Sequence, residues 1–336
     1  MQLIENQPLI NLNTFGLPAS ADFFCEINRE SDLREALKLP QRPIFILGGG
    51  SNLLLTKNIA GLVLKNNLRG IKIVRKTPKK TWIRVAGGEN WHQFVLWTLE
   101  NGLNGLENLS LIPGTVGASP IQNIGAYGVE IKDLFLKLEA IDLITGKKRI
   151  FTKQYCQFGY RDSIFKREMK GRFFITAVWF SLENAPKLNL GYGAINDTLA
   201  EKGIKNPTSK DVSDAVIAIR QSKLPDPAVI GNSGSFFKNP EVSRDFYEKM
   251  VEKWPKMPHF SLPDGHEKIP AGWLIEQAGW KGKRLGNAGC FEKQALVLVN
   301  HGGATGAEVW QLAQNIISSV EQQFGIKLEA EVNVIQ

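Results

Sequence analysis

The sequence has few of the residues that build metal centres and disulfide frameworks. Its 336 residues include only three cysteines, Cys25, Cys156 and Cys290, and four histidines. The cysteines are odd in number, lie far apart and form no Cys-x-x-Cys pair, and no two histidines have the spacing of metal ligands. This pattern argues against a disulfide frame and against a thiolate metal site. We therefore expect no metal.

Long apolar runs are also missing. No stretch approaches the roughly 20 apolar residues that a membrane-spanning helix needs, and the first residues lack the basic and apolar regions of a secretory signal. The hydrophobic content of 43% and the charged content of 22% are typical of globular proteins. We expect a cytoplasmic protein of two or three domains, because 336 residues are too many for one ordinary core.

The net charge of +8 leaves two classes of anionic partner open, nucleic acids and small molecules. The densest basic run, residues 72–80, contains Pro78 and is typical of a solvated hairpin turn. No signature of a DNA-binding or RNA-binding module is present. The composition therefore favours small anionic ligands over nucleic acid.

Two glycine-rich runs stand out, FILGGGSNLLLT at 45–56 and SLIPGTVGASPIQNIGAYG at 110–128. Glycines let a backbone approach a ligand closely, and consecutive N–H groups can cradle a diphosphate. Neither run is a P-loop or a Rossmann fingerprint, and the first is equally compatible with a tight turn between strands. Two such nests favour a long anionic ligand with two ends, such as a dinucleotide. The candidate contact residues are Gly48, Gly49, Gly50, Ser51, Asn52, Pro113, Gly114, Gly117, Ala118, Ser119, Gly125 and Ala126.

Two polar residues in unusual surroundings are candidates for chemistry. Arg161 lies in FGYRDSIFK, where it could bind a carboxylate through two parallel hydrogen bonds or simply pair with Asp162 at the surface. Ser235 lies in GNSGSFFKNP, which is not the nucleophile elbow of hydrolases. It is either a turn residue or a proton donor.

Three charged positions carry similar alternatives. Glu331 follows Glu329 at a spacing of two, and the pair could be exposed or could place one carboxylate in a cleft as a general acid. Arg220 lies in a predicted helix, and Lys223 follows it three residues later. They could meet phosphates, or Lys223 could be a solvated helix end.

Hydrophobic periodicity predicts an alternation of strands and helices. Helices are expected at 32–39, with Ser31 as N-cap, at 91–100, after Thr208, at 243–252, at 271–278 and from a Thr305–Glu308 capping box to Gly325. Strands are expected at 44–47, 53–55, 62–64, 71–74, 82–86, 136–143, 148–151 and 173–182. The strands 136–143 and 148–151 are expected to pair as a hairpin across residues 144–147. The tail 326–335 alternates with period two and predicts a last strand that rejoins an earlier sheet.

Together these segments resemble one family. SLIPGTVGASPIQNIGAYG, FGYRDSIFK, GNSGSFFKNP, AGWLIEQAG, QALVLVN and LEAEV occur in this order, and with NTFG at 13–16 they span essentially the whole chain. They resemble the UDP-N-acetylenolpyruvoylglucosamine reductases, bacterial flavoenzymes of peptidoglycan precursor synthesis, and LNLGYGAIND at 188–197 is similar to the type I subgroup.

The resemblance implies an α+β flavoprotein of three domains. Residues 1–70 and 71–205 plus 326–336 would form an FAD-binding half of the vanillyl-alcohol-oxidase-like (PCMH-type) kind, and 206–325 would bind substrate. It implies non-covalent FAD, NADPH as reductant, UDP-N-acetylglucosamine-enolpyruvate as substrate, no nucleic-acid or membrane partner, and a monomer. By position Arg161, Ser235 and Glu331 would be catalytic, Arg220 would lie near the flavin ring, and Tyr192, Lys223, Asn239 and Gln294 would hold the UDP part. Ala330 and Asn333 depart from the family pattern, which often has proline and arginine there.

The chemistry then implied is a ping-pong hydride transfer. Hydride added to the enol ether pushes charge into the substrate carboxylate, where Arg161 and a protonated Glu331 would stabilise it before Ser235 protonates the neighbouring carbon. Two other interpretations stay open: a flavin oxidase of the same superfamily that acts on a small alcohol, and a basic nucleic-acid-binding protein.

Overall fold

The computed structural model describes all residues 1–336, and the chain forms two compact units. Unit 1 comprises Met1–Gln7, Ala21–Gly50 and Ile59–Ser222, and unit 2 comprises Pro8–Ser20, Ser51–Asn58 and Lys223–Gln336. The chain passes from unit 1 to unit 2 after Gly50, so the first glycine run is divided between them. The expected division into three domains is finer than this and stays a prediction.

Unit 1 contains a four-stranded sheet, a five-stranded sheet, a short hairpin and five helices. The four-stranded sheet has the order β1-β2-β5-β3, with β1 at Ile4–Pro8, β2 at Ser20–Ile27, β5 at Ile59–Asn66 and β3 at Ile44–Leu47. The five-stranded sheet has the order β11-β10-β12-β7-β6, with β11 at Lys148–Thr152, β10 at Phe135–Asp142, β12 at Phe173–Glu183, β7 at Lys80–Ala86 and β6 at Ile71–Lys76. The hairpin is β8 at Gly125–Ala126 with β9 at Val129–Glu130, and the helices are α1 (Glu30–Ala36), α2 (Trp91–Glu100), α3 (Lys153–Cys156), α4 (Gly193–Glu201) and α5 (Ser209–Lys223).

The strands β2, β5 and β3 are parallel, so their carboxyl ends meet at one edge of the sheet. Buried side chains of these strands, of α1 and of the five-stranded sheet, among them Ile27, Leu33, Leu64 and Phe174, form one core cluster. Since β3 ends at Leu47, the first glycine run begins at this carboxyl edge. In open parallel sheets, ligands bind beyond this edge.

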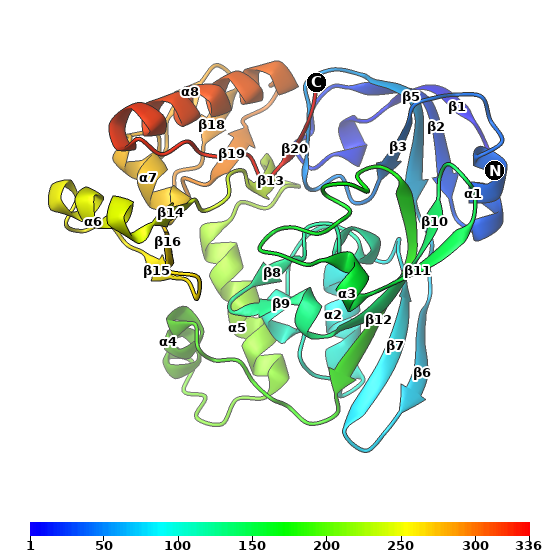
Figure 1. Ribbon diagram of the computed structural model, residues 1–336, viewed down its shortest axis with the longest axis horizontal. Helices are drawn as coiled ribbons and strands as arrows, with labels where there is room; N and C mark the ends of the chain where they lie inside the picture. The colour runs from blue at the N-terminus through cyan, green and yellow to red at the C-terminus, as the bar shows by residue number, and fades with distance from the viewer. The chain divides into compact units, whose positions relative to one another are not determined.

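The five-stranded sheet is antiparallel and confirms the predicted hairpins. Strands β10 and β11 pair across the Ile144–Lys147 turn, and the basic run 72–80 spans β6, the turn at Pro78 and the start of β7. The strands lie side by side in the cyan and green part of Figure 1. Helix α2 packs its buried Trp91, Phe94 and Val95 into the core of this sheet.

Unit 2 contains a four-stranded sheet of order β13-β19-β18-β17, a three-stranded sheet of order β14-β16-β15 and a parallel pair β20-β4. The strands are β4 (Leu53–Leu55), β13 (Gly231–Ser235), β14 (Glu241–Ser243), β15 (Phe260–Ser261), β16 (His266–Lys268), β17 (Arg284–Leu285), β18 (Ala288–Cys290), β19 (Val297–Asn300) and β20 (Asn333–Ile335). The helices are α6 (Arg244–Lys253), α7 (Ala271–Gln277) and α8 (Gly306–Phe324).

Helix α8, red in Figure 1, forms as its sequence predicts. The Thr305 and Glu308 side chains cap each other's backbone N–H groups, and Gly325 ends the helix with a left-handed φ of 67°. Its apolar positions face the core of unit 2, where Leu312, Ile316 and Val320 are fully buried. No helix of the structure is both long and apolar enough to cross a membrane.

Two predicted elements differ in the structure. Helix α1 begins at Glu30, and Asp32 rather than Ser31 caps it, because its carboxylate accepts the Asn28 and Arg29 N–H groups at 3.1 and 2.9 Å. The tail is a strand only at Asn333–Ile335, and it pairs with β4 rather than with any strand of 71–205. Ile326, Leu328 and Val332 are buried, as the alternation predicts. Extended backbone is enough to bury one side of a chain in this way, and continuous hydrogen bonding to a neighbouring strand is not needed.

Candidate functional site

The two glycine runs contact each other backbone to backbone in unit 1. A Cβ added to Gly49 would lie 2.7 Å from Gly114 Cα, and one added to Gly48 would lie 3.0 Å from Thr115 Oγ1. Gly50 is buried with a φ of 67°, a conformation that favours glycine. Only glycine therefore fits at Gly49, and the runs that the sequence predicts to serve one ligand meet here.

A third glycine segment, Gly87-Gly88, packs against the second run, and the sequence interpretation misses it. The Gly117 N–H donates to the Gly87 carbonyl at 2.8 Å, and the Val116 N–H donates to the Glu89 carbonyl at 2.9 Å. A Cβ on Gly117 would lie 2.9 Å from the Gly87 oxygen. The available signal was a glycine pair immediately after a strand.

The other predicted contacts of the second run are distributed along it. Pro113 is exposed, Ala118 is half-buried in a 3-10 turn, and the buried Ser119 donates from its hydroxyl to the Val116 carbonyl at 2.7 Å. Ala126 pairs with Val129 in the β8–β9 hairpin. The run is thus shaped mainly by its own backbone.

Arg161 lies against the glycine at the far end of this run. Its Nη2 donates to the Gly125 carbonyl at 2.6 Å, and a Cβ on Gly125 would come within 3.2 Å of its Nη1. Its guanidinium also lies 5.5 Å from the centre of the Tyr160 ring. The neighbouring Asp162 forms an ion pair with Arg167.

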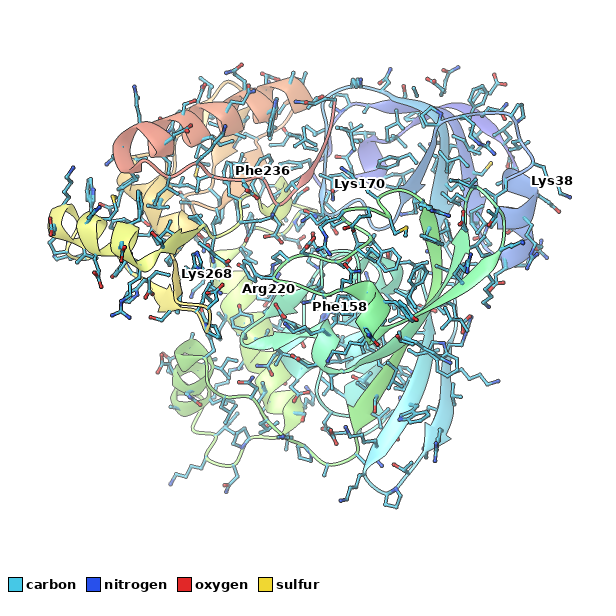
Figure 2. All side chains as sticks on the ribbon, in the orientation of Figure 1. Lys38, Phe158, Lys170, Arg220, Phe236 and Lys268 are labelled. Carbon is cyan, nitrogen blue, oxygen red and sulfur yellow. The ribbon has the colours of Figure 1, made fainter.

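Arg220 extends from α5 toward the same run (Figure 2). Its Nε donates to the Leu111 carbonyl at 3.2 Å, and the neighbouring Tyr127 hydroxyl interacts with it electrostatically. Burial lowers the pKa of this guanidinium, and the positive charge of Arg161 lowers it further. Two arginines that repel each other in this way favour a bound anion.

His92 holds the Leu111 turn from the other side. Its Nδ1 accepts the Leu111 N–H at 3.0 Å, which requires this nitrogen to be unprotonated. Burial lowers the His92 pKa, and the Arg220 charge lowers it further. No sequence signal marked this residue, because its partner is a backbone group 19 positions away.

Tyr192 stands at the start of α4, exposed by 44%, and its ring meets the Tyr127 ring edge-on at 5.1 Å. The buried Asn108 donates to the carbonyls of Tyr127 and Asn189 at 3.0 and 2.9 Å. The Asn189 amide donates to the Gly128 carbonyl at 3.1 Å. These bonds tie the predicted substrate loop to the end of the second glycine run.

The backbone here is strained. Leu111, Asn123, Tyr127 and Arg161 have φ angles of 58°, 45°, 50° and 50°, in a region that costs other residues than glycine on the order of 1–3 kcal/mol. Asn123 stabilises the arrangement, since its amide donates to Glu130 Oε2 and to the Gly159 carbonyl at 3.0 and 2.9 Å. Such strain concentrates at functional sites, which makes this cluster the candidate site of unit 1.

Unit 2 brings Ser235 and Glu331 onto adjacent segments. Ser235, exposed at the end of β13, pairs with Val297 of β19. The next residue, Phe236, accepts the Glu331 N–H at 2.8 Å and donates to the Leu296 carbonyl at 2.7 Å. The tail thus lies beside the serine-bearing segment, with Phe237 and Ala330 as its bridge partners.

The structure also separates the two glutamates of the tail. Glu329 is exposed and forms an ion pair with Lys238 at 3.0 Å, whereas Glu331 is half-buried. Asn52 donates to the Glu331 carbonyl at 3.4 Å and accepts the N–H and side-chain amide of Asn333, each at 3.1 Å. Asn333 therefore has a structural role, since it ties the tail to Asn52.

The remaining predicted substrate contacts lie mostly near α7. Asn239 Oδ1 accepts the Ala271 N–H at 3.0 Å, and a Cβ on Gly272 would lie 3.0 Å from Gln294 Oε1. Asn239 and Gln294 thus meet at the start of this helix. Lys223 is exposed at the end of α5, and Ser51 is half-buried before β4.

Comparison with known proteins places this arrangement in a family. Residues 226–335 match the family model of the UDP-N-acetylenolpyruvoylglucosamine reductase C-terminal domain, and residues 21–150 match the model of an FAD binding domain. The chain is 51% identical over 337 residues to the UDP-N-acetylenolpyruvoylglucosamine reductase of Flavobacterium johnsoniae, with 100% of both chains covered. The chain belongs to the UDP-N-acetylenolpyruvoylglucosamine reductase family. The reductase of Chromobacterium violaceum is 50% identical over 95% of both chains.

Among solved structures, the UDP-N-acetylenolpyruvylglucosamine reductase of Thermus caldophilus matches 100% of this chain with a TM-score of 0.67 and 22% identity. This match supports the predicted α+β flavoprotein fold. Membership in the UDP-N-acetylenolpyruvoylglucosamine reductase family, together with the FAD-binding domain, makes the chain an FAD-dependent oxidoreductase.

The residues of unit 1 fit such a cofactor. The cradle at Gly49 has no space for a Cβ, so main chain can line a diphosphate directly. Arg161 and Arg220 supply positive charge. The fit is to an anionic flavin dinucleotide.

Proposed function

We propose that the protein reduces the enolpyruvyl group of UDP-N-acetylglucosamine-enolpyruvate to give UDP-N-acetylmuramate, with NADPH as reductant. The observation that carries this proposal is the 51% identity to a named reductase over the full length of both chains. A bound FAD would supply the two-electron hydride chemistry that links NADPH to the substrate.

Arg161 is assigned to the substrate carboxylate. Addition of hydride to the terminal carbon of the enol ether moves negative charge into this carboxylate. A guanidinium already fixed by the Gly125 carbonyl needs little reorganisation to stabilise that charge. The left-handed φ of 50° at Arg161 supports a functional position, since such strain persists where the surroundings fix it.

Glu331 and Ser235 are assigned to the rest of the step. A protonated Glu331 donates a hydrogen bond to the developing carboxylate charge, and Ser235 gives its proton to the adjacent carbon. Their neighbouring segments support a shared task, because Phe236 links them through the Glu331 N–H bond at 2.8 Å. Glu329 is a poorer candidate for the acid, since it is exposed and paired with Lys238.

Substrate binding is assigned to the polar residues of the UDP part. Asn239 and Gln294 meet at the start of α7, where they can hydrogen-bond a nucleotide. Lys223 supplies an exposed ammonium for a phosphate, and Tyr192 closes over the bound sugar nucleotide. Arg220 lies with Tyr127 on the flavin side of the reaction.

The test separates the two halves of the cycle. The purified protein should absorb in the flavin bands, lose that absorbance on anaerobic addition of NADPH, and regain it when the UDP-enolpyruvyl sugar is added. Ser235→Ala should leave the first half unchanged and slow the second by about 10²–10⁴-fold. Glu331→Gln should slow the second half by about 10²–10³-fold.

Matched controls are available for both residues. Glu329→Gln changes the glutamate two positions away, and Ser318→Ala changes an exposed serine of α8, so both should retain both rates. A flavin that a small alcohol reduces and NADPH does not would replace the proposal with an oxidase. A colourless protein that binds nucleic acid in a salt-dependent way would end it.

A further inference from the structure

A lysine that the sequence interpretation did not single out lies beside the first glycine run. Lys65 is the penultimate residue of β5, directly opposite Leu47 at the end of β3. Its side chain is half-buried, and its ammonium donates to the carbonyl of Gly48, the first glycine of the run. A backbone carbonyl is an unusual sole partner for a partly buried positive charge.

The surroundings do not neutralise this charge. Glu26 of β2 is the neighbour in the sheet register and attracts the ammonium, but the hydrogen bond goes to Gly48 instead. Burial lowers the Lys65 pKa, and nearby Arg69 adds to this effect, while Glu26 opposes it. An ammonium has three donors, and the structure records an acceptor for one. Two donors are thus available to an anion.

The position of this charge is where the two glycine runs meet. Gly48 is held by Lys65 on its carbonyl and by Thr115 close to its Cα, and Gly49 packs on Gly114. Lys65 thus places a positive charge directly against the backbone of this run. The carboxyl edge of parallel strands, where Lys65 lies, is also where nucleotides bind in open sheets.

We propose that Lys65 is a positioning residue for the FAD diphosphate: it fixes the Gly48 carbonyl and directs its remaining donors to the phosphate oxygens. This inference rests on the proposed cofactor but not on the UDP-sugar reaction. It assigns a role to one side chain that neither the glycine pattern nor the family motifs mark.

The experiment measures cofactor affinity rather than turnover. Flavin is removed from the wild type and the Lys65→Met, Lys65→Arg and Lys72→Met variants. FAD is titrated back while flavin fluorescence is followed, and the affinity for ADP is measured by its competition with FAD. Lys72, exposed on β6 of the same unit, is the matched control. Lys65→Met should weaken binding of both ligands about 10- to 100-fold, as expected for lost charged hydrogen bonds. It should also reduce the dependence of FAD binding on salt. Lys65→Arg should recover most of the affinity.

A purely structural lysine would behave differently. Lys65→Met would then lower the melting temperature of the flavin-free protein, yet bind FAD and ADP with the constants and salt dependence of Lys72→Met, and that result would overturn the proposal. If Lys65→Met does not fold, Lys65→Arg still decides between the two roles. FAD binding by Lys65→Arg that depends on salt as in the wild type supports a retained phosphate contact. FAD binding that no longer shows this salt dependence refutes the contact. A wild type that binds no FAD would instead remove the proposed function itself.

Discussion

Glu139 offers a quantitative test of how unit 1 holds its sheet. Its carboxylate accepts hydrogen bonds from Arg84 Nε and Nη2 at 3.0 and 2.8 Å and from Trp179 Nε1 at 2.7 Å, and it pairs with Lys148 at 2.8 Å. Burial alone would raise the Glu139 pKa, but these partners outweigh it and lower the pKa from 4.5 to about 2. A fall of that size on folding is worth about 3 kcal/mol at neutral pH.

The sign of the pH dependence follows from the direction of this change. The folded protein has the lower pKa, so the unfolded chain binds the proton first as pH falls. The contribution of Glu139 is complete above about pH 4.5 and disappears as pH approaches 2. With the pKa values of 4.5 and about 2, roughly 1.4 kcal/mol of it remains at pH 3.

The perturbation is Glu139→Gln, which keeps the shape and removes the charge. We expect it to lower the free energy of unfolding of unit 1 by about 3 kcal/mol at pH 7 and by clearly less at pH 3. Urea titrations of the flavin-saturated protein, followed by tryptophan fluorescence, measure both values. Asp214→Asn is the control, because its ion pair with Lys210 is exposed and should contribute under about 1 kcal/mol. A variant whose loss of stability is the same at pH 7 and pH 3 would refute the reasoning.

Three further outcomes follow from single contacts. In Gly49→Ala the new Cβ should push Gly114 Cα away by roughly 0.8 Å to reach an ordinary carbon–carbon contact distance, and the flavin content of the purified protein should fall. Gly193→Ala, at a position with free space around it, should retain its flavin. His92 should titrate below 6.5 by NMR of its ring protons, because burial lowers its pKa, and acidification should weaken the Leu111 turn. Thr305→Ala should lower the stability of unit 2 by about 1 kcal/mol in thermal unfolding, since the N-cap of α8 is lost.

The sequence predicts helix ends and turns well where the residues that form them are neighbours in the chain. The capping box at Thr305, the stop at Gly325 and the hairpin around Ile144–Lys147 all appear as expected. The start of α1 does not, because the helix begins at Glu30, before the expected cap Ser31. The Asp32 carboxylate accepts two backbone N–H groups there, a geometry that residue spacing alone does not reveal.

The site was predictable as a set of segments and not as a set of contacts. Glycine content marked both runs, but the packing of Gly49 on Gly114, which leaves no space for a Cβ at Gly49, depends on the tertiary structure that brings the two runs together. Lys65, His92 and Asn108 escaped notice because each acts on a backbone carbonyl or N–H group. Such partners leave no pattern in the order of side chains.

The choice between Glu329 and Glu331 shows what strand register adds to a motif. Both have the same charge and the same alternation, so periodicity treats them as equal. The bonds from the Glu331 N–H to Phe236 and from the Lys238 N–H to Glu329 fix the tail against the serine-bearing segment. A slip of one residue would exchange the sides of every tail side chain. Lys238→Ala tests this: it should release Glu329 from its ion pair while these main-chain bonds keep Glu331 in place. The rate of flavin reoxidation should then stay near the wild-type value, and a loss as large as that of Glu331→Gln would mean that the Lys238–Glu329 ion pair, rather than the main-chain bonds, keeps Glu331 in place.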